Sequence, residues 1–236
     1  MIQLRPVQEA DIEAVRNSFR SGKVAPLLVA PTGYGKTVVF SYLAQASSLR
    51  GNSVLILVHR IELLKQTSSK LMAFGVDHGL VNPRFTPAYG KPIQAASVQS
   101  LIKRLNKANF NPDLIIIDEA HHAVAGTWKK IIDHYPNSKI LGVTATPCRA
   151  SGEGLGDIFD DMIIGPTVQE LIDLEYLVPA RVFAPTTIDT SKVSIVDGEY
   201  NQKELRKLMG ESSITGSAVE STILSFALAH PRLFSV

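Results

Sequence analysis

The sequence predicts an α/β fold with a mostly parallel sheet that is covered by helices on both faces. Short apolar runs alternate with segments whose apolar residues recur at helical spacing, which is the pattern of consecutive β-α-β units. The run Leu114–Ile117 contains only large branched apolar residues, as expected of a parallel strand buried on both sides. Because crossovers between parallel strands are right-handed, the loops that follow the strands should meet at one edge of the sheet.

The individual elements follow from this alternation. Strands are expected at residues 26–30, 54–58, 93–97, 114–118 and 140–144, and helices at residues 8–19, 37–49, 60–73, 98–107 and 127–134. In the third of these helices Ile61, Leu64 and Leu71 fall on one face, and Gly75 suits its end. Residues 82–87 include Pro83 and Pro87 and are expected to form a loop.

The pattern changes after Pro147. The glycines within residues 151–157 predict a loop, and a short helix is expected at residues 168–174. The remaining expectations are a strand at residues 181–184, an irregular connector at 185–198, and helices at 203–209 and 216–229. We therefore expect a first domain of residues 1–184, followed by a connector and helical segment of residues 185–236.

Composition indicates a globular protein. The 236 residues are 45% hydrophobic and 19% charged, which suits one large α/β domain and not a disordered chain. No apolar run approaches the roughly 18 residues of a membrane span, and the N-terminus lacks the pattern of a signal peptide. The single cysteine, Cys148, excludes an internal disulfide and is expected to be a small packing residue. It suits a reducing compartment, so the expected location is the cytoplasm, or the host cytoplasm for a viral protein.

Charge is distributed unevenly along the chain. The net charge of +2 says little about partners, since a local basic patch is enough to bind nucleic acid. Residues 151–175 carry acidic residues and no lysine or arginine, so this segment is not expected to face a phosphate backbone.

A glycine-rich turn carries the most specific signal. The apolar run Pro26–Ala30 leads into the turn, and the helix expected from residue 37 follows it. The turn consists of Pro31, Thr32, Gly33, Tyr34, Gly35, Lys36 and Thr37. Small residues let backbone N–H groups close around phosphates, and the helix N-terminus adds partial positive charge. Lys36 would reach the terminal phosphates, and the hydroxyl of Thr37 would help to hold Mg²⁺. The alternative is an ordinary turn with a solvated lysine.

Two carboxylates follow the apolar run at residues 114–117. Asp118 and Glu119 stand at the C-terminal end of an expected parallel strand, where α/β proteins place their ligands. Asp118 would hold Mg²⁺, directly or through water, and Glu119 would orient and polarise the attacking water. Alone, such a pair is also a common helix cap. Together with the glycine-rich turn it predicts a site for Mg²⁺ and a nucleoside triphosphate.

The motifs and their order resemble superfamily 2 helicases and translocases, the DEAD/DEAH-box group in the broad sense. Six segments of the chain resemble the family's motifs, in the expected order. They are Leu4–Gln8 (the adenine-recognition motif), Ala30–Thr37 (motif I), Val58–Leu63 (motif Ia), Ala96–Leu101 (a nucleic-acid-contact motif), Asp118–His121 (motif II) and Thr144–Pro147 (motif III). The first motif and residues 144–149 are more similar to DNA-directed branches than to RNA-directed ones. Phage-type branch-migration and repair helicases are the most similar of these.

The resemblance implies a RecA-like ATP-binding domain. Its catalytic residues would be Lys36, Asp118 and Glu119, with Thr37 and Asp118 binding Mg²⁺. Arg5 and Gln8 would join residues 31–37 in binding ATP, and Gln8 would recognise adenine through its two-sided amide.

The resemblance also implies contacts beyond the nucleotide. Arg60, Ser97 and Gln99 would contact nucleic acid, although a surface salt bridge is an equal alternative for Arg60. His121, Thr144 and Thr146 would couple the nucleotide state to domain movement, the alternative for the threonines being ordinary hydrogen bonds at a strand end. Trp128 is expected in the core.

In this family a second RecA-like domain supplies arginines to the ATP site, and no such segment is present in the sequence. The chain alone is therefore expected to bind nucleotide but to hydrolyse it weakly, with the second domain supplied in cis or in trans. The expected partner is single-stranded or branched DNA, and no membrane is expected. Alternatives are an RNA helicase, a duplex DNA translocase without unwinding, and a non-catalytic ATP-sensing module, although a sensor has no need of Glu119.

Overall fold

The computed structural model describes residues 3–82, 90–105, 110–123, 126–148 and 154–179, with the short pieces 194–196, 199–200, 204 and 207. Tertiary contacts divide the chain into two units, Met1–Val178 and Pro179–Val236. The strand expected at residues 181–184 and the helix expected at 216–229 lie outside the described residues, as do most of the connector and of the helix expected at 203–209.

The first unit is built on a seven-stranded sheet in which every pair of neighbouring strands is parallel. Its strands are β1 (Pro26–Val29), β2 (Val54–Val58), β3 (Gly79–Val81), β4 (Ile93–Ser97), β5 (Leu114–Asp118), β6 (Lys139–Thr144) and β7 (Asp161–Ile164). They lie in the order β3-β4-β2-β5-β6-β1-β7. The predicted α/β class and parallel sheet are confirmed.

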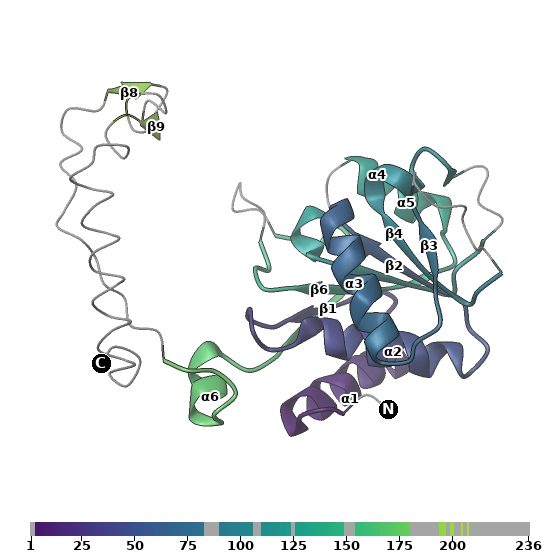
Figure 1. Ribbon diagram of the computed structural model, residues 1–236, viewed down its shortest axis with the longest axis horizontal. Coiled ribbons are helices and arrows are strands. Elements are labelled where there is room, and N and C mark those ends of the chain that lie inside the picture. The colour runs from purple at the N-terminus through teal and green to yellow at the C-terminus, as the bar shows by residue number, and fades with distance from the viewer. Residues whose placement is uncertain are drawn as a thin grey trace, which may run out of the picture. The chain divides into compact units, whose positions relative to one another are not determined.

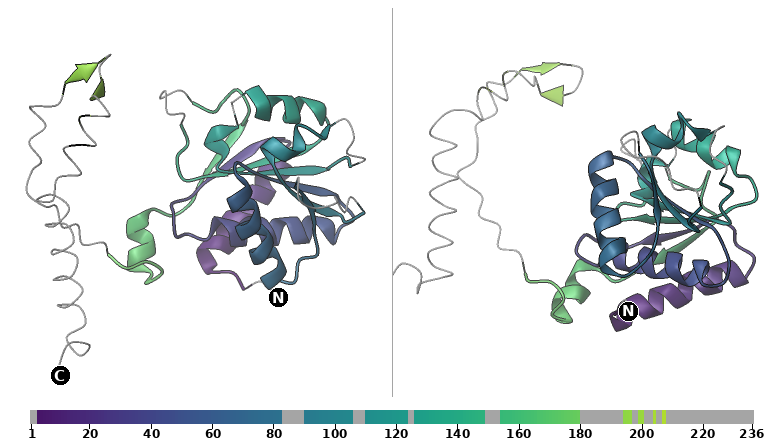
Figure 2. Two further views of the ribbon diagram at one scale, coloured as in Figure 1. Left: turned by 45° about the horizontal axis from the view of Figure 1, so that its top comes forward. Right: turned by 45° about the vertical axis from the view of Figure 1, so that its right-hand side comes forward.

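Helices cover both faces of this sheet (Figures 1 and 2). One face carries α1 (Pro6–Arg20), α2 (Lys36–Ser48) and α3 (Ile61–Ala73), and the other carries α4 (Val98–Leu101), the 3₁₀ turn η2 (Ala120–His122) and α5 (Gly126–His134). A further short helix, α6 (Val168–Asp173), packs Leu171 into the α1–α3 side. Because strand side chains alternate, Leu28 and Ile116 join one half of the core while Leu27 and Ile117 join the other.

Several elements differ from the sequence expectations. The edge strands β3 and β7 were not expected, because three or four residues are too few to show a period and Ile164 of β7 is 72% exposed. The helix expected at residues 98–107 ends at Leu101 and is followed by a turn, where Arg104 donates to the carbonyl oxygen of Asn82 (2.8 Å). This tertiary contact prevails over the helical pattern.

Two side-chain expectations had opposite outcomes. Trp128 is 2% exposed, which confirms its place in the core. Cys148 is exposed, so its interpretation as a packing residue is wrong. It lies four residues after the end of β6 and forms an isolated antiparallel bridge with Gly154.

In the second unit the structure describes one antiparallel pair, β8 (Ile195–Val196) and β9 (Glu199–Tyr200). The carboxylate of Glu204 accepts hydrogen bonds from the backbone N–H and the hydroxyl of Ser194, both at 2.8 Å. In the described parts of the chain, no helix combines the length and apolarity needed to cross a membrane.

Candidate nucleotide and nucleic-acid site

The sheet order brings together sequence motifs that are far apart in the chain. Strands β5, β6 and β1 are direct neighbours, with Asp118 beside Val143 and Val29 beside Thr144. The N–H of Ala30 donates to the carbonyl oxygen of Thr144 (2.9 Å). The glycine-rich loop, the carboxylates and the Thr144 segment therefore meet at the C-terminal edge of the sheet.

The glycine-rich loop depends on glycine at specific positions. Gly33 and Gly35 have φ angles of 86° and 97°, in the left-handed region that side chains with a Cβ disfavour. A Cβ on Gly35 would also lie 2.7 Å from Nε2 of Gln8. Gly35 is thus required both for its backbone angle and for the space it leaves, and α2 begins at the next residue.

The loop presents unused hydrogen-bond donors. Within the described part of the chain, the backbone N–H groups of Gly33, Gly35, Lys36 and Thr37 have no protein acceptor. These groups surround the N-terminus of α2, whose dipole favours an anion. This arrangement fits a polyphosphate.

Lys36 folds back over the same loop. Its Nζ donates to the carbonyl oxygens of Ala30 (3.1 Å) and Pro31 (3.3 Å). Burial lowers the pKa of Lys36, while the nearby charges of Glu119 and Asp118 act in the opposite direction. The ammonium group is therefore held on the loop carbonyls, within the electrostatic influence of the two carboxylates. Tyr34 is buried, Thr32 and Gly33 are exposed, and Pro31, Gly35, Lys36 and Thr37 are half-buried.

Helix α1 holds the loop from behind. Gln8 is 2% exposed; its Nε2 donates to the carbonyl oxygen of Tyr34 (2.9 Å) and its Oε1 accepts from the N–H of Arg5 (3.0 Å). The hydroxyl of Tyr34 donates to the carboxylate of Asp11. Burial raises the pKa of Asp11, and the hydrogen bond from Tyr34 partly opposes this shift. Sequence reasoning missed Asp11, whose only signal is its place three residues after Gln8 on one helix.

The segment after α6 lies against the loop from another side. The guanidinium of Arg5 lies 4.4 Å from the centre of the Tyr176 ring, within the range of a cation–π contact. The next side chain, Leu177, contacts Gly33 so closely that a Cβ there would lie 2.6 Å from its Cδ2. The buried Nη1 of Arg5 has no hydrogen-bond partner among the described residues. The sequence contains no motif that indicates Tyr176 or Leu177.

The two carboxylates stand at the end of β5: Asp118 is its last residue and Glu119 follows it. Burial, with the charge of Glu119 as the second cause, raises the pKa of Asp118 to about 6. Oδ1 of Asp118 accepts from the N–H of Glu119 (3.1 Å). Glu119 has a φ of 52°, uncommon for a residue with a side chain, and such left-handed residues often occur at functional sites.

His121 links the carboxylate segment to the end of β6. The hydroxyl of Thr144 donates to the carbonyl oxygen of Thr146 (3.1 Å) and accepts from its N–H (3.2 Å). It is left to accept from Nδ1 of His121, at 3.0 Å. The same nitrogen lies 3.3 Å from Oγ1 of Thr146 and 3.5 Å from Oε2 of Glu119. The three residues expected to couple the site are thus in direct contact.

The residues expected to contact nucleic acid follow β2 and β4, which continue the same edge beyond β5. Arg60 and Gln99 are exposed. Ser97 is 2% exposed, and its hydroxyl shares a hydrogen bond with that of Ser100 (2.7 Å). His59, at the end of β2, stacks on His122 with ring centres 4.3 Å apart. The end of β2 is thereby tied to η2 and to the carboxylate segment.

Three features lie at one edge of a parallel sheet: the glycine-rich loop, the pair of carboxylates and the contact of His121 with Thr144 and Thr146. Together they define the class of protein, a RecA-like motor domain of superfamily 2 helicases. Residues 1–149 match the family described as Type III restriction enzyme, res subunit, and the chain belongs to that family.

Two relatives cover most of this chain. The 51.5 kDa protein of a Lactococcus phage is 34% identical over 199 residues, which is 84% of this chain and 40% of the relative. IRC3 of Saccharomyces cerevisiae, described as a candidate ATP-dependent helicase, is 34% identical over 230 residues, which is 89% of this chain and 33% of the relative. The chain therefore spans less than half the length of either relative.

Solved structures share the fold. The UvsW helicase of bacteriophage T4 superposes with a TM-score of 0.57 at 17% identity, over 69% of this chain and 60% of that one. The Hef helicase domain of Pyrococcus furiosus gives 0.56 at 20% identity, over 69% and 38%. At these identities the likeness establishes the fold and not the substrate.

Proposed function

We propose that the chain is the N-terminal motor domain of an ATP-dependent DNA helicase or translocase, which binds Mg-ATP at the loop of residues 31–37. The observation that carries the proposal is the meeting of unused loop N–H donors, Lys36 and the Asp118–Glu119 pair at one edge of the sheet. Membership of the family supports an ATP-dependent motor.

Each residue has a distinct task in the phosphate site. Lys36 exchanges the carbonyl oxygens of Ala30 and Pro31 for the β- and γ-phosphates, to which the loop N–H groups also donate. Thr37 and Asp118 would hold Mg²⁺, and the ion would supply positive charge to stabilise the phosphate groups. Glu119 orients the attacking water and accepts its proton.

Arg5 and Gln8 form the adenine side of the site. Gln8 retains one N–H and one lone pair beyond its bonds to Tyr34 and Arg5, and these suit the adenine amino group and ring nitrogen. The buried Nη1 of Arg5, which lacks a described partner, adds a donor at the same place. The bonds of Gln8 also tie adenine recognition to the shape of the phosphate loop.

Hydrolysis is proposed to need a second RecA-like domain, in cis or in trans, because this site contains no arginine directed at the γ-phosphate among the described residues. Residues 1–184 then form the ATP-binding domain, and residues 185–236 lead toward the second one. His121, Thr144 and Thr146 transmit the state of the carboxylate segment through their shared Nδ1 contact.

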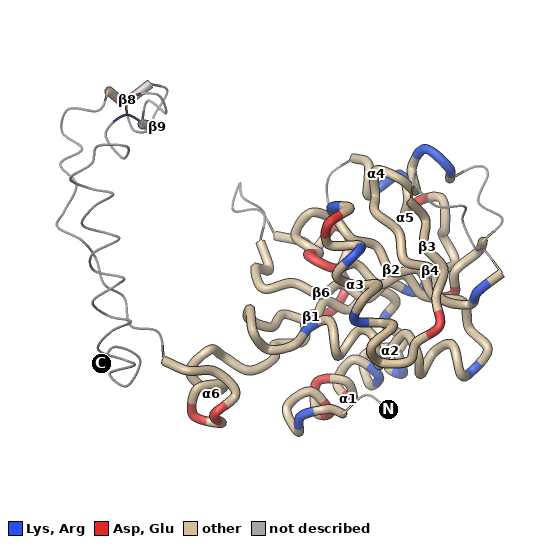
Figure 3. The backbone as a smooth tube through the Cα atoms, in the orientation of Figure 1, with Lys and Arg blue, Asp and Glu red and all other residues tan. Residues whose placement is uncertain are grey.

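DNA is the proposed polymer, contacted by Arg60 and Gln99 and by the Ser97 segment. Arg60 and Gln99 are exposed at the site edge, whereas the hydroxyl of Ser97 must leave Ser100 to reach a phosphate. The residues 144–149, similar to DNA-directed branches, support DNA over RNA. Helix α6 carries only acidic charged residues (Figure 3), which argues against that surface as a phosphate contact.

The test is nucleotide binding and ATP turnover by the chain, alone and with a second RecA-like domain added. Each is measured with single-stranded DNA, duplex DNA, a branched junction and RNA. We expect Lys36→Ala to abolish binding and Glu119→Gln to retain binding but lose turnover. Lys130→Ala, which removes an exposed lysine from α5, should match the unaltered chain.

The outcomes separate the alternatives. If only RNA stimulates ATP turnover, RNA and not DNA is the substrate. If duplex DNA stimulates turnover without strand separation, the protein is a translocase. Binding without turnover in every combination would make the chain an ATP-sensing module. Mg-ATP binding that is as tight after Lys36→Ala as before would overturn the assignment of the loop as the site.

A further inference from the structure

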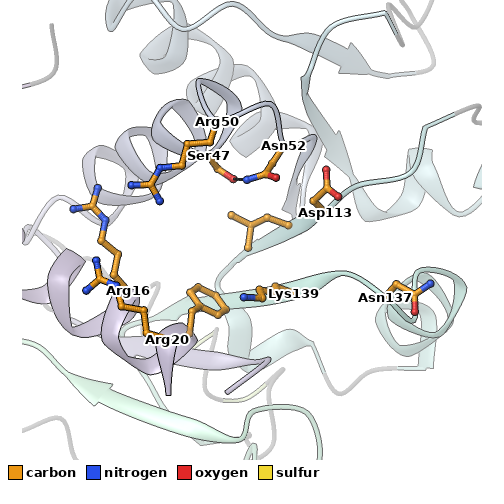
Figure 4. Close-up of a pocket in the computed structure, with 10 residues that line it drawn as sticks. Arg16, Arg20, Ser47, Arg50, Asn52, Asp113, Asn137 and Lys139 are labelled. Atoms are coloured by element: carbon orange, nitrogen blue, oxygen red, sulfur yellow. Dashed lines mark hydrogen bonds between the residues drawn. The ribbon is translucent and has the colours of Figure 1, made fainter. Parts of the chain in front are cut away.

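A second site lies at the opposite edge of the sheet from the phosphate loop. A pocket of about 520 Å³ opens where α1 and α2 end and where β5 and β6 begin. Figure 4 shows its side chains arranged around a hollow, contributed by these separate elements. The lining residues are Arg16, Phe19, Arg20, Ser47, Arg50, Asn52, Asp113, Leu114, Asn137 and Lys139. We refer to it as the basic pocket.

Positive charge is in excess in the basic pocket. The four basic side chains Arg16, Arg20, Arg50 and Lys139 face two acidic ones, Asp113 in the lining and Glu13 beside it. Asp113 is already occupied, because its Oδ2 accepts from the N–H (2.7 Å) and hydroxyl (2.8 Å) of Ser53.

The cations differ in how far they are neutralised. Glu13 pairs with Arg20 at 2.5 Å and more loosely with Arg16 at 3.6 Å. The side chain of Arg50 has no ion pair or hydrogen bond within the described residues. Among the described residues, the side chain of Lys139 makes a cation–π contact, with Nζ 5.2 Å from the centre of the Phe19 ring, and no ion pair. Positive side chains at the C-terminal ends of α1 and α2 interact favourably with the helix dipoles. That effect does not account for Lys139, which begins a strand, or for the hollow.

The basic pocket also has an apolar extension. A recess of about 110 Å³ shares Arg16, Phe19, Arg50 and Leu114 with the pocket and adds Leu43, Ala46 and Leu141. Asn52 lines both, and Asn137 lines the pocket, so amide groups lie near the charges. A site with cations at its mouth and an apolar recess suits a ligand with an anionic group joined to a flat ring system.

We propose that the basic pocket binds a nucleoside phosphate, with the phosphate between Arg50, Lys139 and Arg16 and the base directed to the recess beside Phe19. Guanidinium groups match phosphate oxygens in pairs, and the ammonium of Lys139 adds a point charge. A free mononucleotide and the 5′-phosphorylated end of a nucleic-acid strand share this chemistry. The proposal does not depend on the motor function, since no residue of the pocket belongs to the phosphate loop.

The test is calorimetric titration of the full chain carrying Lys36→Ala, which removes binding at the phosphate loop. The probes are inorganic phosphate, AMP, and a short single strand of DNA with or without a 5′-phosphate. The pocket variant is Arg50→Gln with Lys139→Gln, and the matched control is Lys130→Gln on α5. Thermal unfolding of each variant verifies that it is folded.

AMP should bind more tightly than inorganic phosphate, because only AMP reaches the recess. The pocket variant should lose about tenfold in affinity, and the Lys130 control should lose none. AMP binding without strand binding identifies a free nucleotide as the ligand, and strand binding that requires the 5′-phosphate identifies a strand end. The proposal is overturned if neither AMP nor the 5′-phosphorylated strand binds at about 1 mM. It is also overturned if the folded pocket variant binds these probes as tightly as the Lys130 control does.

Discussion

Replacing the partly buried carboxylate of Asp118 with an amide should stabilise the chain when no ligand is bound. Burial raises the pKa of Asp118 from 3.8 to about 6, so ionising it in the folded chain costs more than in the unfolded chain. About two pKa units correspond to about 3 kcal/mol at pH 7 and above, as an upper figure. Asp118→Asn keeps an acceptor for the N–H of Glu119 and removes that cost.

The pH dependence has a definite sign. The folded chain binds more protons than the unfolded chain between pH 3.8 and about 6. The stability associated with protonated Asp118 is therefore complete below about pH 4 and is lost as the pH rises through about 6. Asp118→Asn should match the unaltered chain near pH 4 and exceed it by about 1–3 kcal/mol near pH 7.5.

Urea unfolding at a series of pH values measures this difference, with circular dichroism as the signal and equal m-values as the check on the unfolded state. Lys130→Gln serves as the control for altered surface charge. An Asp118→Asn variant that is no more stable than the parent at pH 7.5 would refute the reasoning. So would a gain that is equal at pH 4 and pH 7.5.

Three further predictions follow from the geometry. Gly142→Ala should destabilise the chain by about 1–3 kcal/mol in thermal or urea unfolding, since its Cβ would lie 2.6 Å from Cζ of Phe159, whereas Gly126→Ala, in open space, should not. Tyr34→Phe should cost about 1–3 kcal/mol by removing the hydrogen bond to the buried carboxylate of Asp11, and should weaken nucleotide binding in a titration; equal stability of variant and parent would show that this hydrogen bond does not hold the loop against α1. Thr144→Val should leave nucleotide affinity unchanged while reducing stimulation of ATP turnover by DNA in the presence of the second domain, and undiminished stimulation would show that the contact with His121 carries no coupling.

The central strands could be predicted closely from the sequence. The bounds expected for the strands at 54–58, 93–97 and 114–118 are those of β2, β4 and β5. A parallel strand buried on both faces is mostly apolar, and this composition marks β2 and β5. Strand β4 also contains the buried polar residues Gln94 and Ser97, so composition marks it less clearly. The edge strand β7 alternates between half-buried and exposed residues over only four positions, so its composition does not indicate where it begins or ends.

The partners of the predicted site residues could not be derived in the same way. Gln8 and Lys36 were singled out by motif, but their bonds to the loop carbonyls depend on how α1 and the loop pack. Ser97 matched a motif, yet its hydroxyl is buried and bonded to Ser100. Which atoms are free for a ligand is a property of the packed molecule.

The sequence by itself determined the parallel α/β class, the glycine-rich turn that leads into α2 and the two carboxylates at the end of β5, because local periodicity and residue type record burial and backbone angle. Tertiary structure alone decided the order of the strands, the clamp of Tyr34 on Asp11, the raised pKa of Asp118 and the basic pocket at the opposite edge. These depend on contacts between residues far apart in the chain, and a one-dimensional pattern records that a side chain is buried but not what it is buried against.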